Sequence, residues 1–166
     1  LPTAHWNPKE HEGKVEEIQL KDKILIPGLI NSHTHAAMSL LANYADDVSF
    51  NDWLFNYIWP IENKLLSNKF VRDGTELAVA EMLLSGTTCF NDMYFFAEET
   101  ARVCIDAGIR GNIGMTIIDF PSNYGSSAEE YLRKGQTMHD KFKSHPLITT
   151  AFAPHAIYSV SESMLS

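Results

Sequence analysis

Several features that would assign this 166-residue chain to other classes of protein are missing from its sequence. Its only two cysteines, Cys89 and Cys104, lie in no ligand spacing, which excludes a disulfide framework and predicts small buried residues in a reducing compartment. A single bridge between them stays open. No apolar run approaches the roughly 20 residues that span a bilayer, so we expect a cytoplasmic protein with no membrane partner.

Positive charge is also scarce. The chain has 13 lysines and arginines against 21 aspartates and glutamates, a formal net charge of -8. It therefore has no basic footprint for a phosphate backbone, and nucleic acid is a poor candidate partner. Hydrophobic residues make up 45% of the chain and charged residues 20%, a balance typical of a globular protein that buries a core.

The start of the chain differs from the rest. Residues 1–22 are polar, and within them residues 15–20 alternate loosely, which predicts a strand with one wet face. The sequence begins without methionine and stops where a further helix would begin. We therefore expect a truncated chain whose first residues belong to something larger.

From residue 24 onward, strand-like apolar runs alternate with helical patterns. We predict strands at 24–32 (fully buried at its end), 87–91, 109–116 and 147–152. Between the strands we predict a kinked helix or two short ones after Ser49 or Asn51, interrupted by Pro60. One helix capped by Ser67 follows, and then two helices at 97–107 and 128–143. This alternation predicts right-handed βαβ units and a parallel sheet. A closed eight-unit barrel needs about 250 residues, so such units would make only part of one.

His33 and His35 lie two residues apart at the carboxyl end of the first predicted strand. Residues i and i+2 of a strand point to the same face, so both imidazoles can converge on one ion at the mouth of a barrel, where such folds place active sites. Zinc accepts imidazole nitrogens and keeps one position for water in catalytic sites. A bare His-x-His pair is nevertheless common, and by itself it does not predict a metal site.

The string PGLINSHTH at residues 27–35 resembles the signature of the amidohydrolase superfamily at the end of its first barrel strand. The resemblance extends over nearly the whole chain. It implies an α/β fold, a partial TIM-type (β/α)8 barrel of about the first four strand-helix units over residues 27–166. Residues 1–26 would be the remnant of a small N-terminal β domain. One divalent metal ion, zinc, would be held by His33 and His35.

Two more segments resemble the 5-methylthioadenosine and S-adenosylhomocysteine deaminases of that superfamily, relatives of the s-triazine chlorohydrolases. The first is ADDVSFNDWL at 45–54 followed by WPIE at 59–62. It implies that Glu62 binds ribose, because one carboxylate can accept hydrogen bonds from both vicinal hydroxyls of the sugar. The second is APHAIYS at 153–159, which implies that His155 contacts the substrate. From local pattern alone, a solvated glutamate and a loop-ordering histidine are the alternatives.

The resemblance implies hydrolytic deamination of an adenine nucleoside at a C–N bond of its purine ring, with metal-activated water as nucleophile and ammonia as leaving group. Catalytic residues are expected only beyond Ser166: a third histidine ligand, a glutamate and a late aspartate. A guanine deaminase, an s-triazine hydrolase and an inactive fragment stay open as alternatives. Association into a homo-oligomer is open as well. So is the preferred sulfur substituent, because Met115, Ser126 and Ser127 stand where some members have arginines.

For the remaining polar and aromatic residues, the default expectation is a structural or surface role. Asp92 follows the second predicted strand and is interpreted as a loop-ordering carboxylate. Four histidines without a partner at ligand spacing are expected at the surface: His5, His11, His139 and His145. Four aromatic residues could include a wall for an adenine ring, although core packing is the default for them: Trp53, Phe55, Tyr57 and Trp59.

Overall fold

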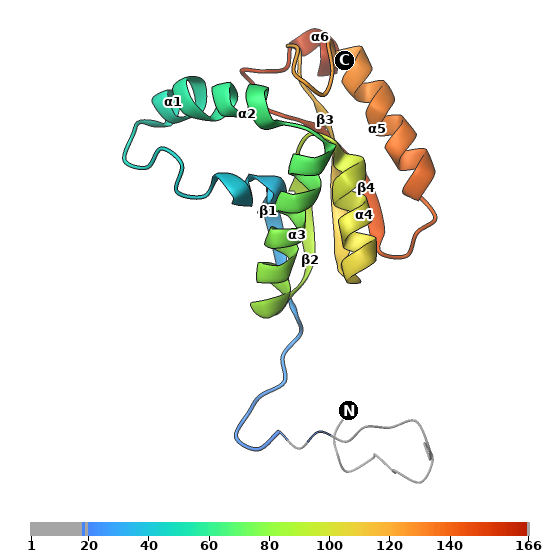
Figure 1. Cartoon of the computed structure of the whole chain (residues 1–166). Helices are drawn as coiled ribbons and strands as arrows, with labels where there is room; N and C mark the ends of the chain where they lie inside the picture. The colour runs from blue at the N-terminus through green and yellow to red at the C-terminus, as the bar shows by residue number, and fades with distance from the viewer. Residues whose placement is uncertain (1–17, 19, 166) are drawn as a thin grey trace.

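A computed structural model describes residues 18 and 20–165 of the chain as a parallel sheet covered by helices (Figure 1). The strands are β1 (Leu29–Thr34), β2 (Thr87–Met93), β3 (Arg110–Ile117) and β4 (Ile148–Pro154). They pair in parallel in the order β1-β2-β3-β4. Because this order follows the chain, right-handed crossovers place the connecting helices on one face of the sheet. The prediction of an α/β fold built from strand-helix units of the barrel type is confirmed.

The helices begin and end largely where the sequence predicts. They are η3 (Ala36–Leu41), α1 (Phe50–Asp52), η4 (Trp53–Ile58), α2 (Trp59–Leu65), α3 (Asn68–Leu84), α4 (Ala97–Ala107), α5 (Ala128–Phe142) and α6 (Glu162–Leu165). The predicted caps Ser49 and Ser67 each accept a hydrogen bond from a backbone amide of the first turn. Such bonds satisfy donors that a helix leaves unpaired at its start. Gly108 ends α4 with φ of 75°, a conformation that favours glycine.

The helical segment before α3 differs from its prediction. We expected Pro60 to interrupt this segment, as a kinked helix or as two short ones, but helical residues continue without a gap from Phe50 to Leu65, with Pro60 in the first turn of α2. The irregularity is the π-helix η4, which ends at Ile58, two residues before Pro60. A π-turn closes a wider ring than an α-turn and is frequently found at functional sites.

The prediction that the first strand ends fully buried is wrong. β1 lies at the edge of the described sheet, and Leu29 and Ile30 are 54% and 73% exposed. The continuous apolar run predicted burial on both faces, which an edge strand does not reach. The strand predicted at 15–20 falls almost wholly outside the described residues, so the β domain over residues 1–26 stays a prediction.

The core lies between the sheet and helices α3, α4 and α5. Its largest cluster of buried side chains includes Val79, Phe90, Cys104, Ile113 and Met138. Both cysteines are free, so no bridge joins them, and burial raises the pKa of the Cys104 thiol to about 12. Among the described residues, no helix combines the length and the apolar character needed to cross a membrane.

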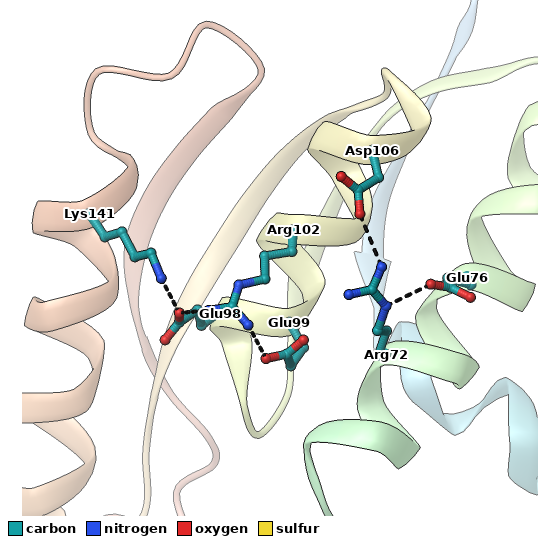
Figure 2. A network of polar contacts seen from close by, with 7 residues as sticks. All are labelled: Arg72, Glu76, Glu98, Glu99, Arg102, Asp106 and Lys141. Carbon is teal, nitrogen blue, oxygen red and sulfur yellow. Dashed lines mark hydrogen bonds and ion pairs between the residues drawn. The ribbon is translucent and has the colours of Figure 1, made fainter.

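A network of ion pairs joins α3, α4 and α5 on the outer surface (Figure 2). Its members are Arg72, Glu76, Glu98, Glu99, Arg102, Asp106 and Lys141. Arg72 of α3 contacts Asp106 of α4 at 3.1 Å. Glu98 of α4 contacts Lys141 of α5. Most of these side chains are at least one-third exposed, and exposed pairs contribute little to stability. Glu99 differs, because its side chain is only 8% exposed and pairs with Arg102 at 2.7 Å.

Arg102→Met is expected to lower the free energy of unfolding by about 1–2 kcal/mol, because it keeps the aliphatic stem but leaves the buried Glu99 carboxylate without its partner. Urea unfolding followed by circular dichroism measures the change. Adding Glu99→Gln should recover most of the loss. Arg72→Met is the matched control: its carboxylate partners are 52% and 63% exposed, so it should cost about 0.5 kcal/mol or less. Equal losses in the two single variants would contradict the assignment.

Candidate active site

The carboxyl ends of the strands meet at one edge of the sheet, where β/α folds place their functional sites. Figure 1 shows α1 and α2 beyond the same end of the sheet as α6. A cavity of 260 Å³ opens there, and its lining includes three of the four predicted site residues: His35, Glu62 and His155. His33 is not among the lining residues. Segments far apart in the sequence therefore line the same cavity.

The structure brings the rings of His33 and His35 together, with centroids 5.1 Å apart and planes at 83°. Nδ1 of His35 lies 2.6 Å from the carbonyl oxygen of Met93. Since a carbonyl oxygen only accepts, this nitrogen carries the proton and Nε2 keeps its lone pair. That is the tautomer in which a histidine ligates a metal through Nε2.

The donor set fits part of a metal site. Two imidazoles suit a borderline cation such as zinc, whose catalytic sites take three protein ligands and a water. Within residues 18 and 20–165, however, no group of three or more His, Cys, Asp or Glu could hold an ion. His33 and His35 could thus offer two nitrogen ligands, and a complete site needs more.

Asp92 lies within β2, so the prediction that it follows the strand is wrong. It is 1% exposed, and its Oδ1 accepts hydrogen bonds from the Ala36 amide at 2.7 Å and the Thr34 hydroxyl at 2.8 Å. Burial raises the pKa of Asp92, while the hydrogen bonds from Ala36 and Thr34 act in the opposite direction. These contacts agree with the interpretation of Asp92 as a carboxylate that orders a loop, and that loop carries His35.

Glu62 is 7% exposed, so the alternative of a solvated surface glutamate is wrong. The Tyr94 hydroxyl donates a hydrogen bond to its Oε1 at 2.5 Å. Burial raises the pKa of Glu62, partly offset by the Tyr94 hydrogen bond and by the nearby His35. Burial and the Glu62 charge raise the pKa of Tyr94 far above its usual value, which keeps this hydroxyl a donor. A buried carboxylate beside a cavity is costly and marks a candidate ligand site.

His155 follows the last residue of β4, as predicted, and is half-buried. Its Nδ1 lies 2.7 Å from the Ser159 hydroxyl, and its backbone amide donates to the Ile117 carbonyl at 3.1 Å. Burial lowers the pKa of His155, and the nearby His35 acts in the same direction. The imidazole is therefore neutral at neutral pH and can donate or accept. His155 both orders its own loop and lines the cavity.

Aromatic side chains form much of the cavity wall. Trp53 and Trp59 line it, whereas Phe55 and Tyr57 are 51% and 39% exposed and are not among its lining residues. Trp59 packs against Phe120 with ring centroids 5.1 Å apart. Flat aromatic surfaces of this kind suit a planar ring.

Most of the lining residues received no site role from the sequence, Tyr94 and Phe120 among them. These two lie just after a strand, so attention to the residues that follow each strand would have found them. Met115, Ser126 and Ser127 are not among the lining residues; Met115 is buried in the core and Ser127 caps α5.

Two further histidines of the described part of the chain, His139 and His145, lie outside the cavity. His139 is exposed, as predicted, and its Nδ1 lies 2.6 Å from the Thr150 hydroxyl. His145 is half-buried and accepts a hydrogen bond from the Leu147 amide, so its predicted surface position holds only in part. His5 and His11 fall outside the described residues.

Comparison with known proteins identifies the family to which the chain belongs. A profile of the amidohydrolase family matches residues 24–166. A 5-methylthioadenosine/S-adenosylhomocysteine deaminase of Saccharophagus degradans is 51% identical over 150 residues, which are 90% of this chain and 34% of that protein. A solved adenosine deaminase of Xanthomonas campestris with bound zinc is 48% identical with a TM-score of 0.81, over 83% of this chain and 31% of that one.

A guanine deaminase of C. acetobutylicum, solved with bound guanine, is 21% identical with a TM-score of 0.73 over 84% of this chain and 35% of that one. At this identity the likeness shows the fold alone. The chain spans about a third of the length of the curated relatives it matches.

Proposed function

Because the chain belongs to the amidohydrolase family, we propose that it is part of a metal-dependent deaminase that removes the amino group of an adenine nucleoside. The observation that carries the proposal is the single cavity onto which His35, Glu62 and His155 converge. The substrates would be 5-methylthioadenosine or S-adenosylhomocysteine, and the products the inosine analogue and ammonia. The similarity to the Saccharophagus degradans deaminase supports this choice over a guanine or s-triazine substrate.

His33 and His35 would hold one divalent metal ion. The protonated Nδ1 of His35 leaves Nε2 free for it, and the zinc-bound relative at 48% identity supports zinc as its identity. When bound, the metal activates water as the nucleophile. The further ligands and the groups that move protons would lie in the rest of the full-length protein, beyond Ser166.

Glu62 and His155 would bind the substrate. The Glu62 carboxylate can accept hydrogen bonds from both hydroxyls of a ribose, since the hydrogen bond from Tyr94 reaches only Oε1. The neutral His155 imidazole can donate to or accept from a purine nitrogen or a sugar oxygen. Trp53, Trp59 and Phe120 would offer apolar surface to the base or to the sulfur substituent.

The compartment and the partners follow from the same features. Two free cysteines, one of them buried, suit a reducing compartment such as the cytoplasm. The partner is a small-molecule nucleoside. Assembly into a homo-oligomer stays a prediction.

The test compares the full-length protein with the 166-residue chain. Zinc is measured by atomic absorption, and deamination is followed as ammonia release from 5-methylthioadenosine, S-adenosylhomocysteine, guanine and an s-triazine. We expect one zinc per full-length chain, ammonia from an adenine nucleoside only, and no turnover by the shorter chain. Ammonia from guanine alone, or turnover of the triazine alone, followed as ammonia from an amino-triazine or as chloride from a chloro-triazine, would replace the proposed function with that alternative. A zinc-free, inactive full-length protein would reject enzymatic function altogether.

A further inference from the structure

We propose that two residues at the carboxyl end of β2 are positioning residues for two separate parts of the site. Asp92 positions the segment that carries the metal ligand His35, and Tyr94 positions the substrate carboxylate of Glu62. The proposal rests on the proposed function and assigns the groups that keep its ligands in place. Metal ligands and binding groups work best when surrounding hydrogen bonds fix their orientation.

Asp92 contacts the residue before His35 and the residue after it. One carboxylate oxygen accepts from the Ala36 amide at 2.7 Å and lies 2.8 Å from the Thr34 hydroxyl, whose one proton is shared between Asp92 and the Asn91 carbonyl at 2.9 Å. The next residue, Met93, accepts from the His35 ring at 2.6 Å. Two neighbouring residues of β2 therefore hold the backbone around His35 and the orientation of its imidazole. Asp92 and Ala36 are 1% and 4% exposed, so water has no access to replace these bonds.

The opposite side of this segment is held by packing. Gly74 of α3 lies so close to η3 that a Cβ on it would fall 2.3 Å from the carbonyl oxygen of Ala37. The chain after His35 is thus confined between the Asp92 carboxylate and the backbone of α3. Confinement on both sides leaves the imidazole little freedom, as a preorganised ligand requires.

Tyr94 performs the corresponding task for Glu62. Its hydroxyl has one proton, and it donates that proton to Oε1 of Glu62 at 2.5 Å across 32 residues of sequence. Within residues 18 and 20–165 no hydrogen bond reaches Oε2, which leaves that oxygen for a ligand. The backbone of Tyr94 is itself fixed, because its carbonyl accepts from the buried Thr116 hydroxyl at 2.9 Å. Glu62 is therefore tied to the sheet rather than only to its own helix.

The two tasks can be separated by experiment in the full-length protein. Asp92→Ala is expected to weaken zinc affinity by about 10–100-fold, measured by competition with a chromophoric chelator, while KM at saturating zinc stays within about twofold of wild type. Asp92→Asn should restore most of the affinity, because its Oδ1 can still accept both hydrogen bonds. Thr34→Val removes one of the two bonds without changing shape. It should weaken zinc binding in the same direction, which keeps the test valid if Asp92→Ala does not fold.

Tyr94→Phe is expected to give the converse pattern. KM for the nucleoside should rise about tenfold, the effect of losing one hydrogen bond to a charged group, while zinc affinity stays unchanged. If Tyr94→Phe leaves KM unchanged while Glu62→Gln raises it, the positioning role of Tyr94 is wrong and the substrate role of Glu62 stands. If neither raises KM, the proposed role of Glu62 itself is wrong. Unchanged zinc affinity in both Asp92→Ala and Thr34→Val, with loss in His35→Ala, would reject the role of Asp92 alone.

Discussion

Replacing His35 by alanine in the full-length protein is expected to lower kcat/KM for its adenine nucleoside by about 1000-fold or more, together with loss of the bound metal. A metal lowers the pKa of its bound water to about 7, and a site that loses a ligand loses most of this activation. Of the two proposed ligands, His35 has its ring held by the Met93 carbonyl and its backbone flanked by the Ala36–Asp92 bond. His33→Ala should act in the same direction.

Metal content by atomic absorption and steady-state deamination are the measurements. His139→Ala is the control, since His139 is an exposed histidine of α5 whose ring contacts Thr150; its metal content and activity should match wild type. A His35→Ala protein that keeps stoichiometric zinc and more than about a tenth of its activity would remove His35 from the metal site. Far-ultraviolet circular dichroism verifies that the variant is folded.

Glu62→Gln is expected to lower kcat/KM about 10–100-fold, mainly through KM, because a charged acceptor for ribose hydroxyls contributes on the order of 1.5–3 kcal/mol. A 2′-deoxy substrate sharpens the measurement. The wild-type protein should discriminate against it, and the variant should lose most of that discrimination. Discrimination that is the same in both proteins would show that Glu62 does not bind the 2′-hydroxyl.

Glu62→Gln should not lower the stability of the fold at neutral pH. A loss of activity in this variant would therefore come from substrate binding and not from unfolding. Burial raises the pKa of Glu62. A raised folded-state pKa means that the contribution of Glu62 to stability is present below its unfolded pKa and is lost as pH rises through the folded value. At neutral pH the metal-free Glu62→Gln protein should therefore unfold at the same temperature as wild type or higher, and any advantage should vanish in acid. A lower unfolding temperature at pH 7 would contradict this account.

Local pattern was sufficient for the secondary structure of most of the fold. The α4 prediction at 97–107 matches the observed helix, and Ser49 and Ser67 cap their helices. These features depend on neighbours within one or two turns, which a sequence displays directly. The burial of β1 and the π-helix η4 depend on where the strand lies in the sheet and on how the helix packs, and neither is encoded in periodicity.

The site shows the same division between local and distant contacts. The resemblance of residues 153–159 singles out His155, and the end of the fourth predicted strand places it at the mouth. Local pattern does not show the burial of Glu62, because its partner Tyr94, just after β2, is 32 residues away in sequence. The sequence suggests that Asp92 orders a loop but does not identify that loop, since the donors at Thr34 and Ala36 lie more than 50 residues earlier. Long-range hydrogen bonds are the part of this site that a single sequence does not display.

The π-helix η4 has a consequence for how the cavity can diverge between related proteins. A π-turn holds one residue more than the α-helical path, as an insertion tolerated within a helix would. Losing one residue there would restore a regular helix and turn the residues before it by about 100° relative to α2. Trp53 would then leave the wall, while Trp59 and Glu62, which follow η4, would keep their places. A single-codon deletion could thus reshape the wall at Trp53 without disturbing the histidines or the carboxylate.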